Sequence, residues 1–310
     1  MRTYILVQAM TDVRYWLAAA RLRTLPLAVS TIGMGHTLAY IDGYHDLRIT
    51  ILSILTAVFL QVLSNFSNDY GDSIHGADSA ERQGPMRMVQ SGVISLSQMK
   101  QAMYIMALMS LCTGSLLIWV AIDGWMMKVL FFVLGLLAIW AAVNYTAGDK
   151  PYGYTGKGDI SVFIFFGLIT VIGSYYLQTG SINWMILLPA IACGTLSTGV
   201  LNVNNIRDIE SDYKAGKMSI PVKIGRSAAV QYHGFLLVAA VMALVIYGIL
   251  VPYGWSLRWL FIPVSSLLLV NFIAVRKHHS ADLLDPYLKQ LALSSTALIA
   301  SFCLCLIMFS

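Results

Sequence analysis

Charged residues are the scarcest broad class in this chain. Only 11% of its 310 residues are Asp, Glu, Lys or Arg, while 58% are hydrophobic. A soluble domain carries about 25% charged residues. The apolar material is too abundant for one soluble core, so the composition excludes an ordinary soluble enzyme. It predicts an all-α, polytopic integral membrane protein that sits in the lipid bilayer.

Cysteine and histidine are also sparse, and neither is arranged as a metal or redox site. Cys112, Cys193, Cys303 and Cys305 all lie inside apolar runs, and no pair has zinc or redox spacing. The six histidines form no ligand cluster. The chain also lacks a glycine-rich phosphate loop, a dinucleotide fingerprint and a nucleophile elbow. Its pI of about 9.0 reflects basic membrane loops, and we expect no nucleic-acid partner.

Long apolar windows are what the chain has in abundance. A membrane-spanning helix needs about 20 consecutive apolar residues, and such windows predict about nine transmembrane helices. They cover 20–41, 48–66, 97–121, 125–145, 160–178, 183–204, 228–251, 256–275 and 288–309. We interpret residues 1–310 as one membrane-embedded domain with two weakly related halves, 20–145 and 160–275, followed by the final helix.

Lysine and arginine positions in the loops predict the orientation. With a cytoplasmic N-terminus and nine helices, seventeen of the twenty basic residues fall on the cytoplasmic side, and only Arg48, Lys128 and Arg258 fall outside. Missing one helix would exchange the downstream loops and remove the bias. The pattern therefore predicts a protein of the cytoplasmic (inner) membrane with its C-terminus outside.

Two acidic, asparagine-containing clusters follow the second and sixth apolar windows. The first contains Asn65, Asn68, Asp69 and Asp72, with Asp78 shortly after, and the second contains Asn204, Asn205, Arg207, Asp208 and Asp212. Ionisable groups at membrane depth are costly, so they indicate function by default. Both clusters fall on the predicted cytoplasmic side.

The spacing inside each cluster suggests a cation site. Asn68 and Asp72 are four residues apart, as are Asp208 and Asp212, and residues at this separation are neighbours on a helix surface. Paired carboxylates repel unless a cation lies between them, and such oxygen ligands suit Mg²⁺. The alternative is a solvated helix end with Asn and Asp as caps. The occurrence of two such clusters on the same predicted side of the membrane favours metal binding.

Basic residues follow both acidic clusters and could bind a phosphorylated ligand. A diphosphate that leaves as an anion needs positive charge, which Arg and Lys supply. The candidates are Arg87, Lys150, Arg207 and Lys217, and Arg87 and Lys217 are preferred because each lies just beyond its cluster. The positive-inside bias alone also explains basic residues in these loops.

A third polar window, 144–159, is rich in glycine and tyrosine and is too polar to span the bilayer. Tyr145, Tyr152 and Tyr154, together with Asn65, could line a pocket for an aromatic acceptor. The alternative is an interfacial belt of aromatic residues.

These motifs resemble a known family. Asn68-Asp69-x-x-Asp72 and Asp208-x-x-x-Asp212 look like the two aspartate-rich motifs of the UbiA-type membrane prenyltransferases. The Gly84-Pro-Met-Arg87 turn and the Pro151-Tyr-Gly-Tyr154-x-Gly-x-Gly-Asp159 loop are similar to those of the 1,4-dihydroxy-2-naphthoate polyprenyltransferases of menaquinone synthesis. The similarity runs from Leu22 to about Gly225.

The resemblance implies a helical bundle around a central cavity and a Mg²⁺-dependent reaction. Asn68 and Asp72 would hold one Mg²⁺, and Asp208 and Asp212 the other. These ions would bind the diphosphate of a polyprenyl donor. Asp69 and Tyr145 would join Asp72, Asp208 and Asp212 as catalytic residues. The acceptor would be an aromatic hydroxy acid, 1,4-dihydroxy-2-naphthoate, which loses its carboxylate to give demethylmenaquinol.

Three alternatives stay open at this point. Another phenolic acid, such as 4-hydroxybenzoate, could be the acceptor. A polytopic transporter could also carry intramembrane acids, although it predicts them near the bilayer midplane. A phosphatidyl transferase that uses CDP-alcohols would need an Asp-Gly-x-x-Ala-Arg stretch that this chain lacks. The sequence indicates neither the prenyl chain length nor the oligomeric state.

Overall fold

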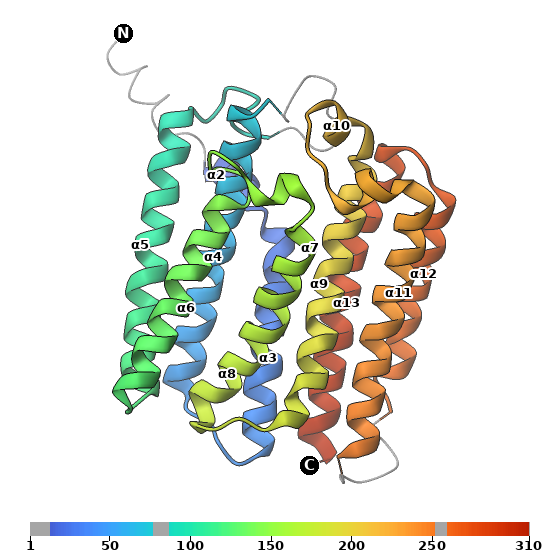
Figure 1. The fold of residues 1–310 in the computed structure, drawn as a ribbon. Helices are drawn as coiled ribbons and strands as arrows, with labels where there is room; N and C mark the ends of the chain where they lie inside the picture. Colours follow the sequence, from blue (N-terminus) through green and yellow to red (C-terminus); the bar gives the residue numbers. More distant parts are fainter. Residues whose placement is uncertain (1–12, 77–86, 252–258, 310) are drawn as a thin grey trace.

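The protein folds as a bundle of long helices (Figure 1). The computed structural model describes residues 13–76, 87–251 and 259–309. Asp78, and the start of the predicted window 256–275, lie outside these residues. Helices are the regular structure of the described parts, which confirms the all-α prediction.

The first half of the chain supplies a short helix and four long ones. Their bounds are α2 Val13–Ala20, η1 Leu22–Thr24, α3 Leu25–Ile41, α4 Leu47–Ile74, α5 Leu96–Ala121 and α6 Trp125–Asn144. The second half begins after the loop that carries η2 Tyr152–Thr155. Its elements are α7 Gly158–Val162, η3 Phe163–Ile169, α8 Thr170–Thr179, η4 Trp184–Ile186, α9 Leu187–Arg207, α10 Ile209–Lys214, α11 Ile220–Leu250, α12 Ile262–Lys277 and α13 Ala281–Phe309.

Each of the nine predicted windows contains a helix among the described residues. Seven helical segments are long and apolar enough to cross a membrane. The other two windows contain α3 and α12, which have 17 and 16 described residues and run beside the longer helices. The count of nine is therefore approximate, but the chain is an integral membrane protein by its helices.

Several helices extend beyond their apolar windows. α4 continues to Ile74, eight residues past the predicted end, because its polar final turns keep their backbone bonds and pack against the rest of the protein. α11 starts at Ile220 and is interrupted at Gly225, which has a φ of +77°.

Pro189 and Pro263 both lie in the first turn of a helix and not within its interior. The backbone N–H groups of a helix's first turn have no acceptor within the helix. Proline, which has no N–H group, is therefore tolerated there.

The fifth predicted helix is continuous but not uniform. α7 leads through η3, a π-helical stretch of seven residues, into α8. π-helical turns are rare and often mark functional sites. This segment forms one wall of the bundle interior, and α9 packs against it.

The three polar windows meet at one end of the bundle. The C-terminal end of α4, the loop after α6 and α10 all lie at this end, whereas α13 finishes at the opposite end (Figure 1). The apolar core beneath them is built mainly on α9, which packs against α11 and α13. The fold thus brings together segments about 140 residues apart in sequence.

Candidate active site

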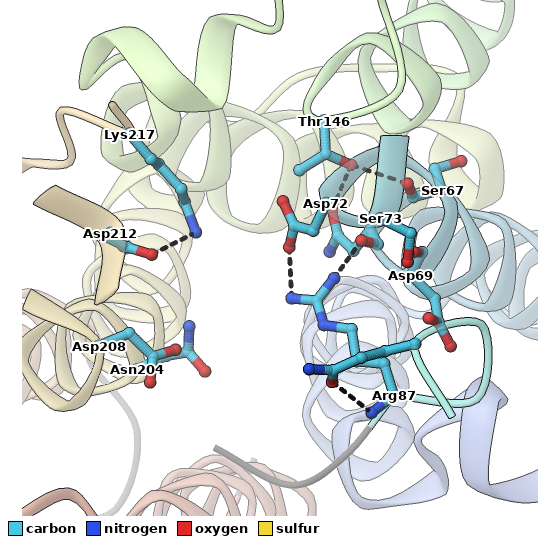
Figure 2. A network of polar contacts seen from close by, with 12 residues as sticks. Ser67, Asp69, Asp72, Ser73, Arg87, Thr146, Asn204, Asp208, Asp212 and Lys217 are labelled. Atoms are coloured by element: carbon cyan, nitrogen blue, oxygen red, sulfur yellow. Dashed lines mark hydrogen bonds and ion pairs between the residues drawn. The ribbon is translucent and has the colours of Figure 1, made fainter. Parts of the chain in front are cut away.

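Asp72 is the buried centre of the first acidic cluster. Its side chain lies on the last turns of α4 and is only 2% exposed. One carboxylate oxygen accepts a hydrogen bond from the Tyr154 hydroxyl at 2.6 Å, and the other forms an ion pair with Arg87. Arg87 also donates to the backbone carbonyl of Asn68. Asn68, Asp72 and Arg87 are therefore adjacent. The helical spacing predicts that Asn68 and Asp72 are neighbours, and Figure 2 shows Arg87 beside Asp72.

Asn68 is held in place by the chain that follows α6. Its side-chain oxygen accepts a hydrogen bond of 3.0 Å from Thr146, whose hydroxyl also donates to the carbonyl of Ser67. The approach is close because residue 71 is glycine. A Cβ at Gly71 would lie 2.4 Å from the backbone of Thr146. The glycine thus lets the third polar window pack directly on α4.

Asp69 points to different partners. Its two oxygens accept hydrogen bonds from the backbone N–H groups of Met88 and Val89, at 3.2 and 3.3 Å. Asp69 therefore anchors the segment that carries Arg87. Figure 2 shows its carboxylate turned away from that of Asp72. These contacts suit a positioning role, and the catalytic role of Asp69 stays a prediction from the sequence.

Asp208 and Arg207 form a buried pair at the end of α9. The Arg207 guanidinium donates to both carboxylate oxygens of Asp208 at 2.8 Å, and to Asn204 at 3.0 Å. Its remaining contact is Asp285 on α13, at 2.6 Å, and Asp285 also pairs with Arg23 at 3.7 Å. Arg207, predicted to bind diphosphate, thus orients Asp208 and ties α9 to α13.

Asp212 and Lys217 complete the second cluster. Lys217 lies 3.3 Å from one oxygen of Asp212, and both residues are buried. Burial, helped by the charges of Asp208 and Asp72 and opposed by Lys217, raises the pKa of Asp212 to about 6. The other Asp212 oxygen is buried and has no hydrogen-bond partner among the described residues. The carboxylates of both clusters are therefore close enough to repel each other.

Tyr154 connects the two clusters, which differs from its predicted place in an acceptor pocket. Its hydroxyl binds Asp72, and the Lys217 ammonium lies 5.8 Å from its ring centroid. Its backbone carbonyl accepts a hydrogen bond from Met218 at 2.9 Å. Figure 2 shows Asp212 and Lys217 on one side and Asp72 and Arg87 on the other. One residue of the third window thus joins groups from both halves of the chain.

Tyr145 is wedged under the same loop. Its ring packs against Gly153 and Gly158, where an added Cβ would lie 3.0 and 2.7 Å from tyrosine atoms. Burial first, and then the nearby Asp159, raise the pKa of the Tyr145 hydroxyl well above its usual value. The hydroxyl therefore stays protonated at neutral pH and can act as a hydrogen-bond donor.

A cavity of about 660 Å³ lies inside the bundle beneath the clusters. Asn68, Asn204 and Tyr145 line its polar end. Asn68 and Asn204 precede Asp72 and Asp208 by four residues each, so one residue of each cluster reaches the cavity. Most of the remaining wall is apolar and comes from α4, α5, α6, η3 and α8. The arrangement suits a long apolar ligand with an anionic head.

The structure separates the other predicted residues by environment. Tyr152 lines the cavity, donates to the carbonyl of Ala141 and stacks on Trp140. Asn65 also lines the cavity, but its amide donates to Ala20 and Thr24, which anchors the turn before α3. Lys150 is exposed in the loop.

The donor set fits a divalent cation shared with a ligand. Among the described residues, no three His, Cys, Asp or Glu side chains converge on a metal-binding position. Mg²⁺, however, is usually bound by one or two carboxylates together with waters and substrate phosphates. The buried Asp212 oxygen, which has no hydrogen-bond partner in the described part of the chain, would supply such a ligand atom.

Sequence reasoning missed the residues that support this site. Asp285 lies 78 positions from Arg207, in the polar first turns of α13, and nothing in the local sequence relates the two. Nothing in the sequence around Thr146 indicates a role, because its contacts depend on how α4 packs beside it. Glycines such as those at 71, 153 and 158 are the sequence signal for close packing in these regions.

The sequence matches the model of the UbiA prenyltransferase family over residues 27–301. A Haemophilus influenzae protein named 1,4-dihydroxy-2-naphthoate octaprenyltransferase is 43% identical over 285 residues, covering 91% of this chain and 92% of that protein. The Escherichia coli protein of the same name is 40% identical over 284 residues, with the same coverage.

Solved structures agree on the fold. A UbiA homologue from Aeropyrum pernix superposes with a TM-score of 0.66 at 15% identity, covering 89% of this chain and 97% of its own. A UbiA homologue from Archaeoglobus fulgidus bound to DMAPP and Mg²⁺ gives 0.58 at 18% identity, covering 91% and 98%. The family match over residues 27–301 and the relatives at 43% and 40% identity show that the chain belongs to the UbiA prenyltransferase family.

Proposed function

We propose that this protein transfers a polyprenyl group from a polyprenyl diphosphate to 1,4-dihydroxy-2-naphthoate. The observation that carries the proposal is a pair of buried acidic clusters, each with its own basic partner, beside an apolar cavity that Asn68 and Asn204 of these clusters line. The names of the relatives at 43% and 40% identity support the naphthoate acceptor. The Archaeoglobus homologue bound to DMAPP and Mg²⁺ supports the class of donor.

Asn68 and Asp72 would hold one Mg²⁺, and Asp208 and Asp212 a second. When bound, Mg²⁺ neutralises diphosphate charge and so makes the diphosphate a better leaving group. Arg87 and Lys217 lie beside these carboxylates and would contact the phosphate oxygens. Arg207 keeps Asp208 in position through two hydrogen bonds. Lys150, which is exposed, could meet the diphosphate only at the rim.

The reaction breaks the allylic carbon–oxygen bond of the donor, and the bonding electrons leave with the diphosphate. The electron-rich naphthoate ring attacks the allylic carbon at the position that bears the carboxylate. That carboxylate leaves as carbon dioxide, and its bonding electrons restore the aromatic ring. Tyr145 and Tyr152 line the cavity where the acceptor would lie, and the protonated Tyr145 hydroxyl would orient it. The buried site excludes water, which would otherwise capture the electrophile.

We further propose that the acidic end faces the cytoplasm, in the inner membrane of a bacterial cell. The support is the excess of basic residues in the loops of that end. A transporter is not favoured, because the carboxylates lie at helix ends and not at mid-depth of the bundle.

Product analysis tests the proposed reaction. Purified protein with Mg²⁺ is incubated with octaprenyl diphosphate and either 1,4-dihydroxy-2-naphthoate or 4-hydroxybenzoate, and the products are identified by mass. We expect a prenylated naphthalenediol that has lost the mass of carbon dioxide, and no product after addition of EDTA until Mg²⁺ is restored.

A product that retains the carboxylate would contradict the proposed reaction. Equal use of 4-hydroxybenzoate would contradict the proposed specificity. Boiled protein, and protein supplied with donor alone, are the controls.

A further inference from the structure

One buried acid near the site has no part in the chemistry described so far. Asp159 lies in the first turn of α7, directly after Gly158, and is only 7% exposed. A carboxylate is costly to bury without compensating partners. An acid in the first turn of a helix stabilises the helix N-terminus even when it is solvated, so that role does not require burial. The burial of Asp159 therefore needs another explanation.

The partners of Asp159 differ from those of the acids proposed to hold Mg²⁺. Those acids each have a basic partner, namely Asp72 with Arg87, Asp208 with Arg207 and Asp212 with Lys217. Within the described part of the chain, Asp159 forms no ion pair. Its side chain hydrogen-bonds to the Tyr232 hydroxyl of α11, and its Oδ2 atom is buried without a hydrogen-bond partner. That oxygen is available to accept a proton from a neighbouring group.

The neighbouring group is the hydroxyl of Tyr145. A Cβ on Gly158 would lie 2.7 Å from the Tyr145 hydroxyl oxygen, and consecutive Cα atoms of a chain are about 3.8 Å apart. Asp159 is therefore one residue away from a direct contact of that hydroxyl. Among the charged groups that act on the Tyr145 hydroxyl and raise its pKa after burial, Asp159 comes first.

The two residues differ in their access to the cavity. Tyr145 lines the cavity, whereas Asp159 lies behind the wall, where Thr198 of α9 donates to its backbone carbonyl at 3.4 Å. The Tyr145 ring is also held edge-on against Tyr152, with ring centroids 5.4 Å apart. A ligand in the cavity would therefore contact Tyr145, and Asp159 would act on the ligand through Tyr145.

We propose that Tyr145 and Asp159 form a proton relay that activates the hydroxyl-bearing ring of the acceptor. Tyr145 contacts the ring hydroxyl, and Asp159 is the positioning residue behind it that takes up the proton. The relay rests on the proposed function, because it requires an acceptor with a ring hydroxyl. It adds to that function the path by which the proton leaves the ring and returns.

The relay balances without a further reactant. As the ring carbon that bears the carboxylate bonds to the allylic carbon, the O–H bond of the neighbouring ring hydroxyl breaks, and the electrons left on oxygen form a carbonyl group. The proton passes to the Tyr145 oxygen while the Tyr145 proton passes to Asp159. The carboxylate is now β to a carbonyl group, an arrangement that loses carbon dioxide readily. The electrons of the broken bond restore the ring, the carbonyl oxygen takes the proton back, and Asp159 is a carboxylate again.

Two substitutions of Asp159 separate a relay from a packing role. Asp159→Asn keeps the shape of the side chain but cannot accept the proton. A group that transfers a proton contributes about a hundredfold or more to the rate, so we expect kcat to fall by about that factor. Asp159→Glu restores a carboxylate and should be at least about tenfold faster than Asp159→Asn. A packing role predicts the reverse order, because the isosteric amide fits and the longer side chain overpacks.

Steady-state kinetics with octaprenyl diphosphate, Mg²⁺ and 1,4-dihydroxy-2-naphthoate measure kcat, and calorimetry measures the affinity for the donor. Donor affinity should stay within about twofold of wild type in both variants, since the relay acts on the acceptor. Asp282, an exposed acid in the first turn of α13, provides the matched control. Asp282→Asn should leave kcat unchanged.

A double variant tests the connection between the two residues. Groups that act in one path have non-additive effects, so Tyr145→Phe combined with Asp159→Asn should lose little more than the slower single variant. Multiplied losses in the double variant, or Asp159→Asn faster than Asp159→Glu, would overturn the relay.

The outcome also distinguishes the relay from the proposed function. Wild-type prenylation of 1,4-dihydroxy-2-naphthoate with an unchanged kcat in Asp159→Asn would overturn the relay and leave the proposed reaction standing. If wild type prenylates 4-hydroxybenzoate instead, the acceptor assignment is wrong. The same variants measured with that acceptor then support or overturn the relay by the same criteria.

Discussion

At the scale of single residues, position on the helix decides what each acid does. Asp69 and Asp72 both lie on α4, are both 2% exposed and are separated by three positions. Asp72 faces Arg87 and Tyr154 in the site, whereas Asp69 receives two backbone N–H groups from the segment after α4. The sequence shows a run of acids, but only the packed structure separates a ligand-binding acid from an anchor.

Substitution by the isosteric amide should separate these two roles. We expect Asp72→Asn to reduce turnover by at least about a hundredfold, because it removes charge aimed at the reacting groups. Its melting temperature should also fall, because the buried Arg87 guanidinium loses its charged partner. Asp69→Asn weakens two charge-assisted bonds and should cost about 2 kcal/mol of stability.

Turnover assays and thermal unfolding in detergent measure the two effects. Asp69→Asn should unfold at a lower temperature and keep substantial activity at low temperature. The reverse pattern, with a stable but inactive Asp69→Asn and an active Asp72→Asn, would contradict the assigned roles.

At the scale of elements, apolar run length predicts where helices lie but not where they end. The windows 97–121 and 125–145 match α5 and α6 within one residue. α4 and α11 extend into polar sequence, because a helix end that packs on protein needs no apolar side chains. The π-helical η3 also leaves no signal in an apolar run. The acidic motifs were predictable since their spacing is helical.

The position of the Tyr145 ring depends most on the loop that follows α6. Gly158→Ala would place a Cβ about 2.7 Å from the Tyr145 hydroxyl oxygen, so the ring must shift. Misplacing a substrate-contacting group by about 1 Å can cost on the order of a hundredfold in rate. We therefore expect a loss of kcat of at least about tenfold. Alanine is also the better helix former, so the protein should stay folded.

Gly33→Ala is the matched control, because a Cβ there meets nothing within 4 Å. Steady-state kinetics compare the kcat of the two variants with that of wild type. Wild-type kcat in Gly158→Ala would show that the position of Tyr145 is unimportant for the reaction.

At the scale of the whole molecule, the site is an assembly of both halves of the chain. Asp72 comes from the first half and Asp212 from the second, and Tyr154 links them through the intervening loop. The loop charges in the sequence predict that all three windows lie on one side of the membrane. It could not reveal contacts such as Arg207 with Asp285, since these depend on how α9 packs against α13.

The predicted orientation can be measured with single cysteines in a background without the four native ones. Tyr213 in α10 is 68% exposed at the acidic end, and Trp184 is 80% exposed at the other end. A membrane-impermeant maleimide should label Trp184→Cys in intact spheroplasts and Tyr213→Cys only in inverted vesicles. The opposite labelling would place the acidic end outside the cell.

The central claim is that the two acidic clusters bind one ligand together. Calorimetric titration of a non-hydrolysable prenyl diphosphate analogue with Mg²⁺, into wild type, Asp72→Asn, Asp208→Asn and the double variant, tests it most directly. Residues that act on one ligand are coupled and non-additive. We predict one ligand per chain, a large loss of affinity in each single variant and little further loss in the double variant. Independent, additive losses, or unchanged affinity in either single variant, would contradict the account.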